Sequence, residues 1–105
     1  MTTTRQGRLR PPDDAPDRGE LIEQVAAIGG VAIQQILSGR LDSAQDYSQA
    51  HDEWVLVLSG RAVVEVEGKP KVLVSGSWMF IPAGVHHRLV ETEAGTSWLA
   101  LHATG

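Results

Sequence analysis

The 105-residue chain contains no cysteine, and this absence excludes several kinds of chemistry. Disulfide bonds, thiolate metal ligands and a cysteine nucleophile are all ruled out. Any metal ion must therefore be held by histidine, carboxylate, amide or phenol groups. The chain offers four histidines and one tyrosine for that purpose, besides its carboxylates and amides.

Long apolar runs and an excess of positive charge are also missing. No segment reaches the roughly 18 consecutive apolar residues of a membrane-spanning helix. The first residues, MTTTRQGRLRPPDD, lack the apolar middle of a secretory signal. The net charge of -4 opposes the basic surface that nucleic-acid binding requires. We therefore expect a cytoplasmic protein that spans no membrane and binds no nucleic acid.

The length and the composition together predict one domain preceded by an arm. A chain of this size forms a single hydrophobic core. Residues 1–18 are rich in Thr, Arg, Pro and Asp and carry few large apolar groups, so they cannot offset their own ordering entropy. We predict a flexible N-terminal arm over residues 1–18 and a β-barrel domain over residues 19–105.

The apolar pattern after the arm predicts short strands. Residues 20–28 leave two possibilities open, a helical layer or an edge strand, because their apolar residues fall at helix-like offsets over a short segment. Residues 53–58 are apolar on both faces, with Val55 and Val57 on one of them, and residues 61–67 alternate apolar with charged side chains. Six or seven such strands with frequent turns indicate an all-β sandwich or small barrel.

Polar side chains precede the central strand at every second position. In an extended chain these residues share one face with Val55 and Val57, and they are Tyr47, Gln49, His51 and Glu53. A carboxylate at the edge of an apolar cavity is costly unless it is paired, protonated or bound to a cation. His87, which follows the turns at Gly76 and at residues 82–84, is the expected partner of Glu53.

The segment from about residue 45 to residue 102 resembles the cupin superfamily. The second cupin motif is a glycine, five residues, Pro-x-Gly, two residues and a histidine, and it is matched completely by Gly76, Pro82, Gly84 and His87. The 15 residues between the two motifs, 61–75, match the short hairpin of small bacterial cupins. The resemblance implies an all-β double-stranded β-helix, or jelly-roll, barrel in a single domain.

The first cupin motif is only half kept. It consists of two histidines separated by one residue, a glutamate four or five positions later and a glycine seven beyond that. Glu53 and Gly60 fit, whereas Tyr47 and Gln49 occupy the two histidine positions. Glutamine is a weak ligand and tyrosine normally stays protonated, so this set would hold an ion less firmly than three histidines.

The resemblance implies a divalent metal ion, Zn, Ni, Fe or Mn, in the barrel. The preferred ligands are Gln49, Glu53 and His87; His51, turned inward by a small bulge, and His102, on a face with Trp98, come next. Glu53 or Tyr47 would act catalytically in proton transfer. Each residue also has an ordinary structural reading, such as an ion pair for Glu53 or a buried hydrogen-bonded imidazole for His87.

Three functions remain open from the sequence. The first is a metal-binding cupin that binds or transforms a small organic molecule in the barrel. The second is a metal-free isomerase or epimerase that uses Glu53 and His87 as acid and base. The third is a non-catalytic module that binds a small ligand.

Two further expectations concern apolar residues. The outward face of the central strand is too apolar to leave in water, and the last strand repeats the problem; the residues are Trp54, Leu56, Leu58, Leu99 and Leu101. Cupins of this size commonly pair, so the resemblance implies a homodimer. Trp78 and Phe80 are expected either to line the cavity or to join the core.

Overall fold

A computed structural model describes residues 3–103 of the chain. Within this range it contains nine strands and one short 3-10 helix, and no α-helix. In chain order the elements are η1 (Pro12–Asp14), β1 (Glu20–Ile28), β2 (Val31–Ser38), β3 (Gln45–Tyr47), β4 (Glu53–Ser59), β5 (Arg61–Val66), β6 (Lys69–Val74), β7 (Trp78–Ile81), β8 (His87–Thr92) and β9 (Thr96–Ala103).

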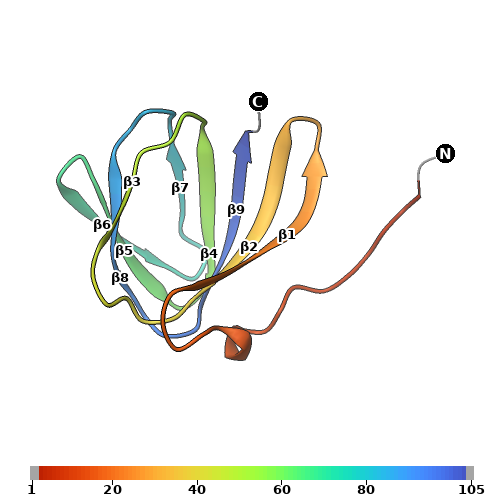
Figure 1. Cartoon of the computed structure of the whole chain (residues 1–105), viewed down its shortest axis with the longest axis horizontal. Coiled ribbons are helices and arrows are strands. Elements are labelled where there is room, and N and C mark those ends of the chain that lie inside the picture. The colour runs from red at the N-terminus through yellow and green to blue at the C-terminus, as the bar shows by residue number, and fades with distance from the viewer. Residues whose placement is uncertain (1–2, 104–105) are drawn as a thin grey trace.

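The strands form two antiparallel sheets that face each other (Figure 1). One sheet has the order β1-β2-β9-β4-β7, and the other has the order β3-β8-β5-β6. Successive strands from β4 onward alternate between the sheets or return by short hairpins, which is the jelly-roll arrangement. The predicted all-β jelly-roll fold is confirmed.

The first strand, β1, resolves the ambiguity over residues 20–28. It pairs with β2 along its length and lies at the edge of the five-stranded sheet, so the helical interpretation is wrong. Gly29, at φ 56°, opens the tight turn of this hairpin. Ile22, Val25 and Ile28 remain exposed, which explains why their helix-like spacing carried no information about packing.

The core lies between the two sheets and follows the alternation along β4. Val55 and Val57 point inward and are buried, and they pack against residues of both sheets, among them Val64, Leu89 and Trp98. Opposite residues in antiparallel strands share a face, so Ala100 of β9 joins Val55 in this layer. The inward row of β4 begins with Glu53, which places a carboxylate at the end of an apolar stripe.

The glycine that ends the first motif is required by the close approach of two strands. Gly60 has φ 95°, and a Cβ atom added there would lie 2.6 Å from Thr96 Oγ1 and 2.8 Å from Thr96 Cα. Thr96 is fully buried and donates to the carbonyl of Glu93 over 2.6 Å. Only glycine fits both the backbone conformation and the space at this position.

Part of the N-terminal segment contacts the barrel. The Arg10 amide donates to Gln35 Oε1 over 2.8 Å, and Gln35 Nε2 donates back to the Arg10 carbonyl over 2.9 Å. The Gly39 amide donates to the carbonyl of Gly19, just after the segment, over 2.8 Å. Residues 3–9 run away from the barrel (Figure 1). The flexibility expected of residues 1–18 stays a prediction.

The outer face of the five-stranded sheet is apolar, and two residues there correct an expectation. Trp78 and Phe80 neither line the cavity nor join the core; their side chains are 61% and 52% exposed. Strand β7 pairs with β4 so that Met79 stands opposite the inward Val55, and its two neighbours therefore point outward. Trp78 stacks on Trp54, with ring centroids 6.3 Å apart.

Candidate functional site

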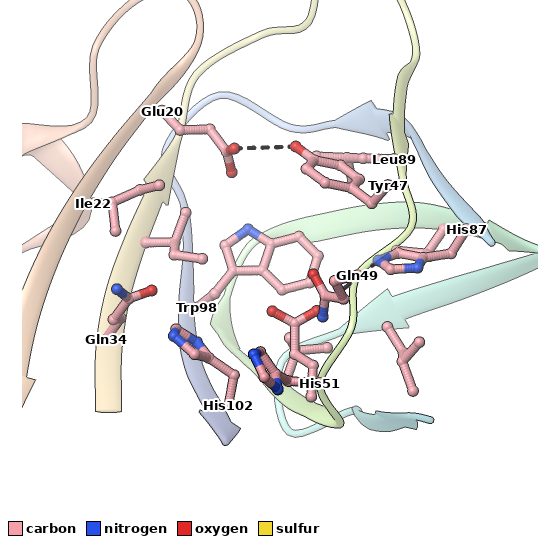
Figure 2. A pocket seen from close by; sticks show the side chains of 15 residues that line it. Glu20, Ile22, Gln34, Tyr47, Gln49, His51, His87, Leu89, Trp98 and His102 are labelled. Atoms are coloured by element: carbon pink, nitrogen blue, oxygen red, sulfur yellow. Dashed lines mark hydrogen bonds and ion pairs between the residues drawn. The ribbon is translucent and has the colours of Figure 1, made fainter. Parts of the chain in front are cut away.

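A cavity of about 300 Å³ opens between the two sheets (Figure 2). The structure brings together around it all six site residues expected from the sequence, which are Tyr47, Gln49, His51, Glu53, His87 and His102. Apolar walls come from both sheets and include Ile36, Val55, Val64 and Leu89. The cavity therefore combines a mostly apolar surface with a few convergent polar groups, which is typical of a ligand-binding pocket.

Strand pairing places the site residues from three directions. Glu53 stands opposite His102 of β9 and opposite Ile81 of β7, and all three side chains face inward. His87 opens β8 and pairs with Tyr47 of β3 on the facing sheet. The two sheets thus bring a carboxylate and an imidazole together across the barrel.

Glu53 and His87 form the central ionisable pair of the cavity. Glu53 Oε1 lies 3.9 Å from His87 Nε2, and the side chains are only 18% and 6% exposed. His87 Nδ1 lies 3.2 Å from the carbonyl of Val85, which can only accept, so Nδ1 carries a hydrogen and donates it. Nε2 is therefore the nitrogen that faces Glu53.

Tyr47 is a hydrogen-bond donor in this structure. Its ring stacks on His87 with centroids 5.5 Å apart, and its hydroxyl donates to Glu20 Oε1 over 3.4 Å. Burial, and next the negative charge of Glu20 and the hydrogen bond to it, raise the pKa of Tyr47 to about 12, with a smaller contribution from Glu53. These features favour positioning of His87 over proton abstraction as the role of Tyr47.

The loop that carries Gln49 and His51 is fastened to the second motif. The Gly84 amide donates to the Gln49 carbonyl over 2.8 Å, and the Ala83 amide donates to Asp52 Oδ1 over 2.9 Å. His51 lies in this loop before β4, with no bulge beside it, and its side chain is exposed at the cavity mouth. The bulge expected to turn His51 inward is therefore not what places it there.

The arrangement does not meet the requirements of a preformed metal centre. Within residues 3–103, no group of three or more His, Asp or Glu side chains is placed so that it could hold an ion. Tyr47 is directed to Glu20, and Gln49 is a neutral amide, so the four cupin ligand positions supply only Glu53 and His87 as ionisable ligands. Metal binding by this set stays a prediction.

Three polar lining or supporting residues were missed by the sequence reasoning. Glu20 and Gln34 line the cavity from β1 and β2, and Ser38 donates to Glu20 Oε2 over 3.2 Å. The signal for Gln34 was a polar residue within a β-branched run. Nothing local signals Glu20, because its contact with Tyr47 joins residues 27 apart in the sequence.

The fold and the cavity define a jelly-roll barrel with an internal pocket of about 300 Å³. The Cupin domain family model matches residues 32–102, which is most of the barrel, and the chain belongs to this family. No helix in the described part of the chain is long and apolar enough to cross a membrane.

Solved structures similar to this chain are also cupin barrels or share their fold. A candidate mannose-6-phosphate isomerase from Ralstonia eutropha JMP134 is 30% identical, with a TM-score of 0.72, over 94% of this chain and 100% of that one. KdgF from Halomonas sp. is 21% identical, with a TM-score of 0.70, over 83% of this chain and 82% of that one. A cupin superfamily protein from Desulfitobacterium hafniense DCB-2 is 19% identical, with a TM-score of 0.71, over 100% and 98%. A comparison with curated proteins gives no match.

Proposed function

We propose that this cupin binds a small carbonyl compound in its barrel and catalyses a proton shift on it, with Glu53 as base and His87 as acid. One observation carries the proposal. Glu53 Oε1 and His87 Nε2 lie 3.9 Å apart, both largely shielded from water, in a cavity that is large enough for a small molecule. A positioned carboxylate and imidazole are the two groups that such a reaction needs.

The proton movements balance with these two residues alone. The Glu53 carboxylate takes a proton from a hydroxyl-bearing carbon next to the carbonyl, while the proton on His87 Nε2 passes to the carbonyl oxygen and an enediol forms. Return of a proton from Glu53 to the neighbouring carbon, and of a hydroxyl proton to His87, gives the isomeric carbonyl compound. The Val85 carbonyl keeps Nδ1 protonated throughout, so Nε2 is the nitrogen that exchanges.

The spacing of the pair favours isomerisation over epimerisation. An epimerase with two separate groups needs them on opposite faces of one carbon, each at about 3 Å, and so about 6 Å apart. A separation of 3.9 Å suits two groups that act on the same face. The 30% identity to a candidate isomerase of an aldose phosphate also supports this reaction class.

Exchange of hydrogen with solvent tests the proposal directly. Simple aldoses, ketoses and their 6-phosphates are incubated with the protein in deuterium oxide, and proton NMR follows the position next to the carbonyl. Exchange should occur with at least one compound and fall at least about 100-fold in Glu53→Gln, because the base is lost. Glu93→Gln, a change at an exposed carboxylate, serves as the control.

Two outcomes would contradict the proton-shift proposal. One is a folded Glu53→Gln variant that exchanges as fast as the original protein. The other is binding of a sugar without any exchange, which would leave the non-catalytic ligand-binding module as the better description.

A divalent metal ion is the second candidate for this site. It is favoured by the three imidazoles of His51, His87 and His102, which line the same cavity as Glu53. Binding would need side-chain rearrangement, since these groups are not clustered in the structure. Two experiments measure metal binding. One is elemental analysis of protein purified without a histidine tag, and the other is thermal denaturation with added Zn, Ni, Mn or Fe.

Neighbouring histidines provide a matched pair for that measurement. His87→Ala should abolish metal retention if the metal hypothesis holds; otherwise it should only lower the free energy of unfolding, by roughly 1–3 kcal/mol, for the lost buried interactions. His86 is exposed and pairs with Asp46 at 3.2 Å, so His86→Ala should cost less than about 1 kcal/mol and leave any bound metal in place.

Homodimerisation and a cytoplasmic location complete the proposed function. The apolar outer face of the five-stranded sheet, with Trp54, Trp78 and Phe80, offers a surface for a second copy. The outer face of the other sheet carries ion pairs such as Arg61 with Glu91. The exposed apolar residues of that other sheet are valines, smaller than the aromatic residues of the first, which favours pairing through the first sheet.

A further inference from the structure

We propose that the cavity selects a ligand without anionic groups, and that Glu20 accepts a hydrogen bond from a hydroxyl or ammonium group at one end of that ligand. The inference rests on the proposed function to the extent that a small molecule occupies the barrel.

The fixed charges around the cavity are negative. Two carboxylates, Glu20 and Glu53, line it, and among the described residues no lysine or arginine does. Glu53 has His87 as its partner, whereas none of the ion pairs described in residues 3–103 includes Glu20. A phosphate or carboxylate in this space would meet negative charge with no lysine or arginine to compensate it.

Hydrogen bonds that begin in the core fix the position of the Glu20 carboxylate. Trp98 Nε1 can only donate, and it donates to Ser38 Oγ over 3.0 Å. Ser38, fully buried, accepts that bond and donates its own proton to Glu20 Oε2 over 3.2 Å. Tyr47 adds a second donor, to Oε1. The carboxylate is thus held from two sides.

Acceptor capacity remains on Glu20 after these bonds. A carboxylate offers about four lone-pair positions, and Ser38 and Tyr47 occupy two of them. In Figure 2 the Glu20–Tyr47 contact lies on one side of the Trp98 indole, and His51 and His102 lie on the other. A ligand that reaches past Trp98 from the side of His51 and His102 can therefore present a donor to Glu20.

The hydroxyl and the ammonium group have in common that each donates a hydrogen bond, from O–H or N–H, and each would belong to a molecule of modest size. A cavity of about 300 Å³ is at the small end of ligand pockets, which suits a compound of about the size of a monosaccharide. A charge-assisted hydrogen bond to a carboxylate is stronger than one between neutral groups, and the ligand loses it when the carboxylate is replaced.

A binding experiment with three matched sets of probes tests the inference. The sets are neutral hexoses, their 2-amino derivatives and their 6-phosphates, measured by calorimetry with the full chain at about pH 8, above the ordinary histidine pKa of about 6.5. Neutral or amino sugars should bind and phosphates should not. Glu20→Gln should weaken binding roughly tenfold or more, and more for amino sugars if the natural donor is an ammonium group.

Each result has a distinct meaning. Preferential binding of the phosphates would overturn the inference and leave the proposed function standing. An unchanged affinity in Glu20→Gln, with a control Glu23→Gln on the same strand also unchanged, would overturn the role of Glu20. Absence of binding by all three sets would contradict ligand binding in the barrel, and with it both proposals.

Discussion

Tyr47 is the only tyrosine of the chain, so its ionisation can be measured without interference from another phenol. Burial, followed by the charge of Glu20, raises its pKa from 10.0 to about 12. The ultraviolet absorbance of tyrosinate should therefore remain absent at pH 10 and appear only near pH 12. Glu20→Gln should bring the midpoint part of the way back toward 10.0, because burial, the larger cause, remains.

The same shift makes the stability of the protein depend on pH in a defined window. The folded state holds the Tyr47 proton more tightly than the unfolded chain does, so the associated stability is fully present below pH 10. It is lost as pH rises from 10.0 toward about 12. Urea denaturation across this window should show the decline, and Tyr47→Phe should reduce it. A midpoint near 10 in the folded protein would contradict the half-buried, hydrogen-bonded position of the phenol.

Residues of the site differ in how far the sequence could predict them. Glu53 and His87 were predicted because motif spacing fixes their places in two strands, and the barrel brings them within 3.9 Å of each other. Glu20 was not predicted, because its contact with Tyr47 joins residues 27 apart in the sequence. Trp78 and Phe80 were misplaced because alternation assigns residues to two faces without saying which face is inside.

At the scale of the element, the tight turn between β4 and β5 decides whether the two sheets can meet. Gly60→Ala should destabilise the fold, because the new Cβ would lie 2.6 Å from Thr96 Oγ1 in a backbone conformation that L residues rarely adopt. Gly68 has a similar φ of 80° with open space around it. Gly68→Ala therefore isolates the backbone cost, about 1–2 kcal/mol.

Chemical denaturation of the two glycine variants measures the difference. Gly60→Ala should lose at least about 1 kcal/mol more than Gly68→Ala, for the displaced Thr96 and its hydrogen bonds. Equal losses would mean that the barrel accommodates the Cβ by a small shift of β9.

The elements themselves were predicted with uneven success for physical reasons. Strands β4 and β5 followed from alternation and from their flanking turns, because burial on one or both faces dictates those patterns. Strand β1 was ambiguous because its apolar residues stay exposed at a sheet edge, so no burial pattern constrained them. Tertiary pairing with β2, and not local propensity, settles its conformation.

For the whole molecule, the fold class was predictable because the second motif and the hairpin length are specific to one architecture. Contacts between copies of the chain could not be predicted in this way. The outer face of the five-stranded sheet bears a stacked Trp54–Trp78 pair beside Phe80, and a water-facing cluster of this kind is a common mark of an association surface.

Association through that face can be tested with two matched double variants. The protein should elute as a dimer, at about twice its 11.3 kDa, in size exclusion with light scattering. Trp78→Ser with Phe80→Ser should give a folded monomer, since these are the most exposed aromatic residues of the face. Val72→Ser with Val74→Ser removes exposed apolar groups, 56% and 48% accessible, from β6 of the other sheet, so this variant should stay dimeric. If only the β6 variant dissociates, the interface lies on the four-stranded sheet. If the unmodified protein is already monomeric at micromolar concentration, the aromatic face does not bind a second copy.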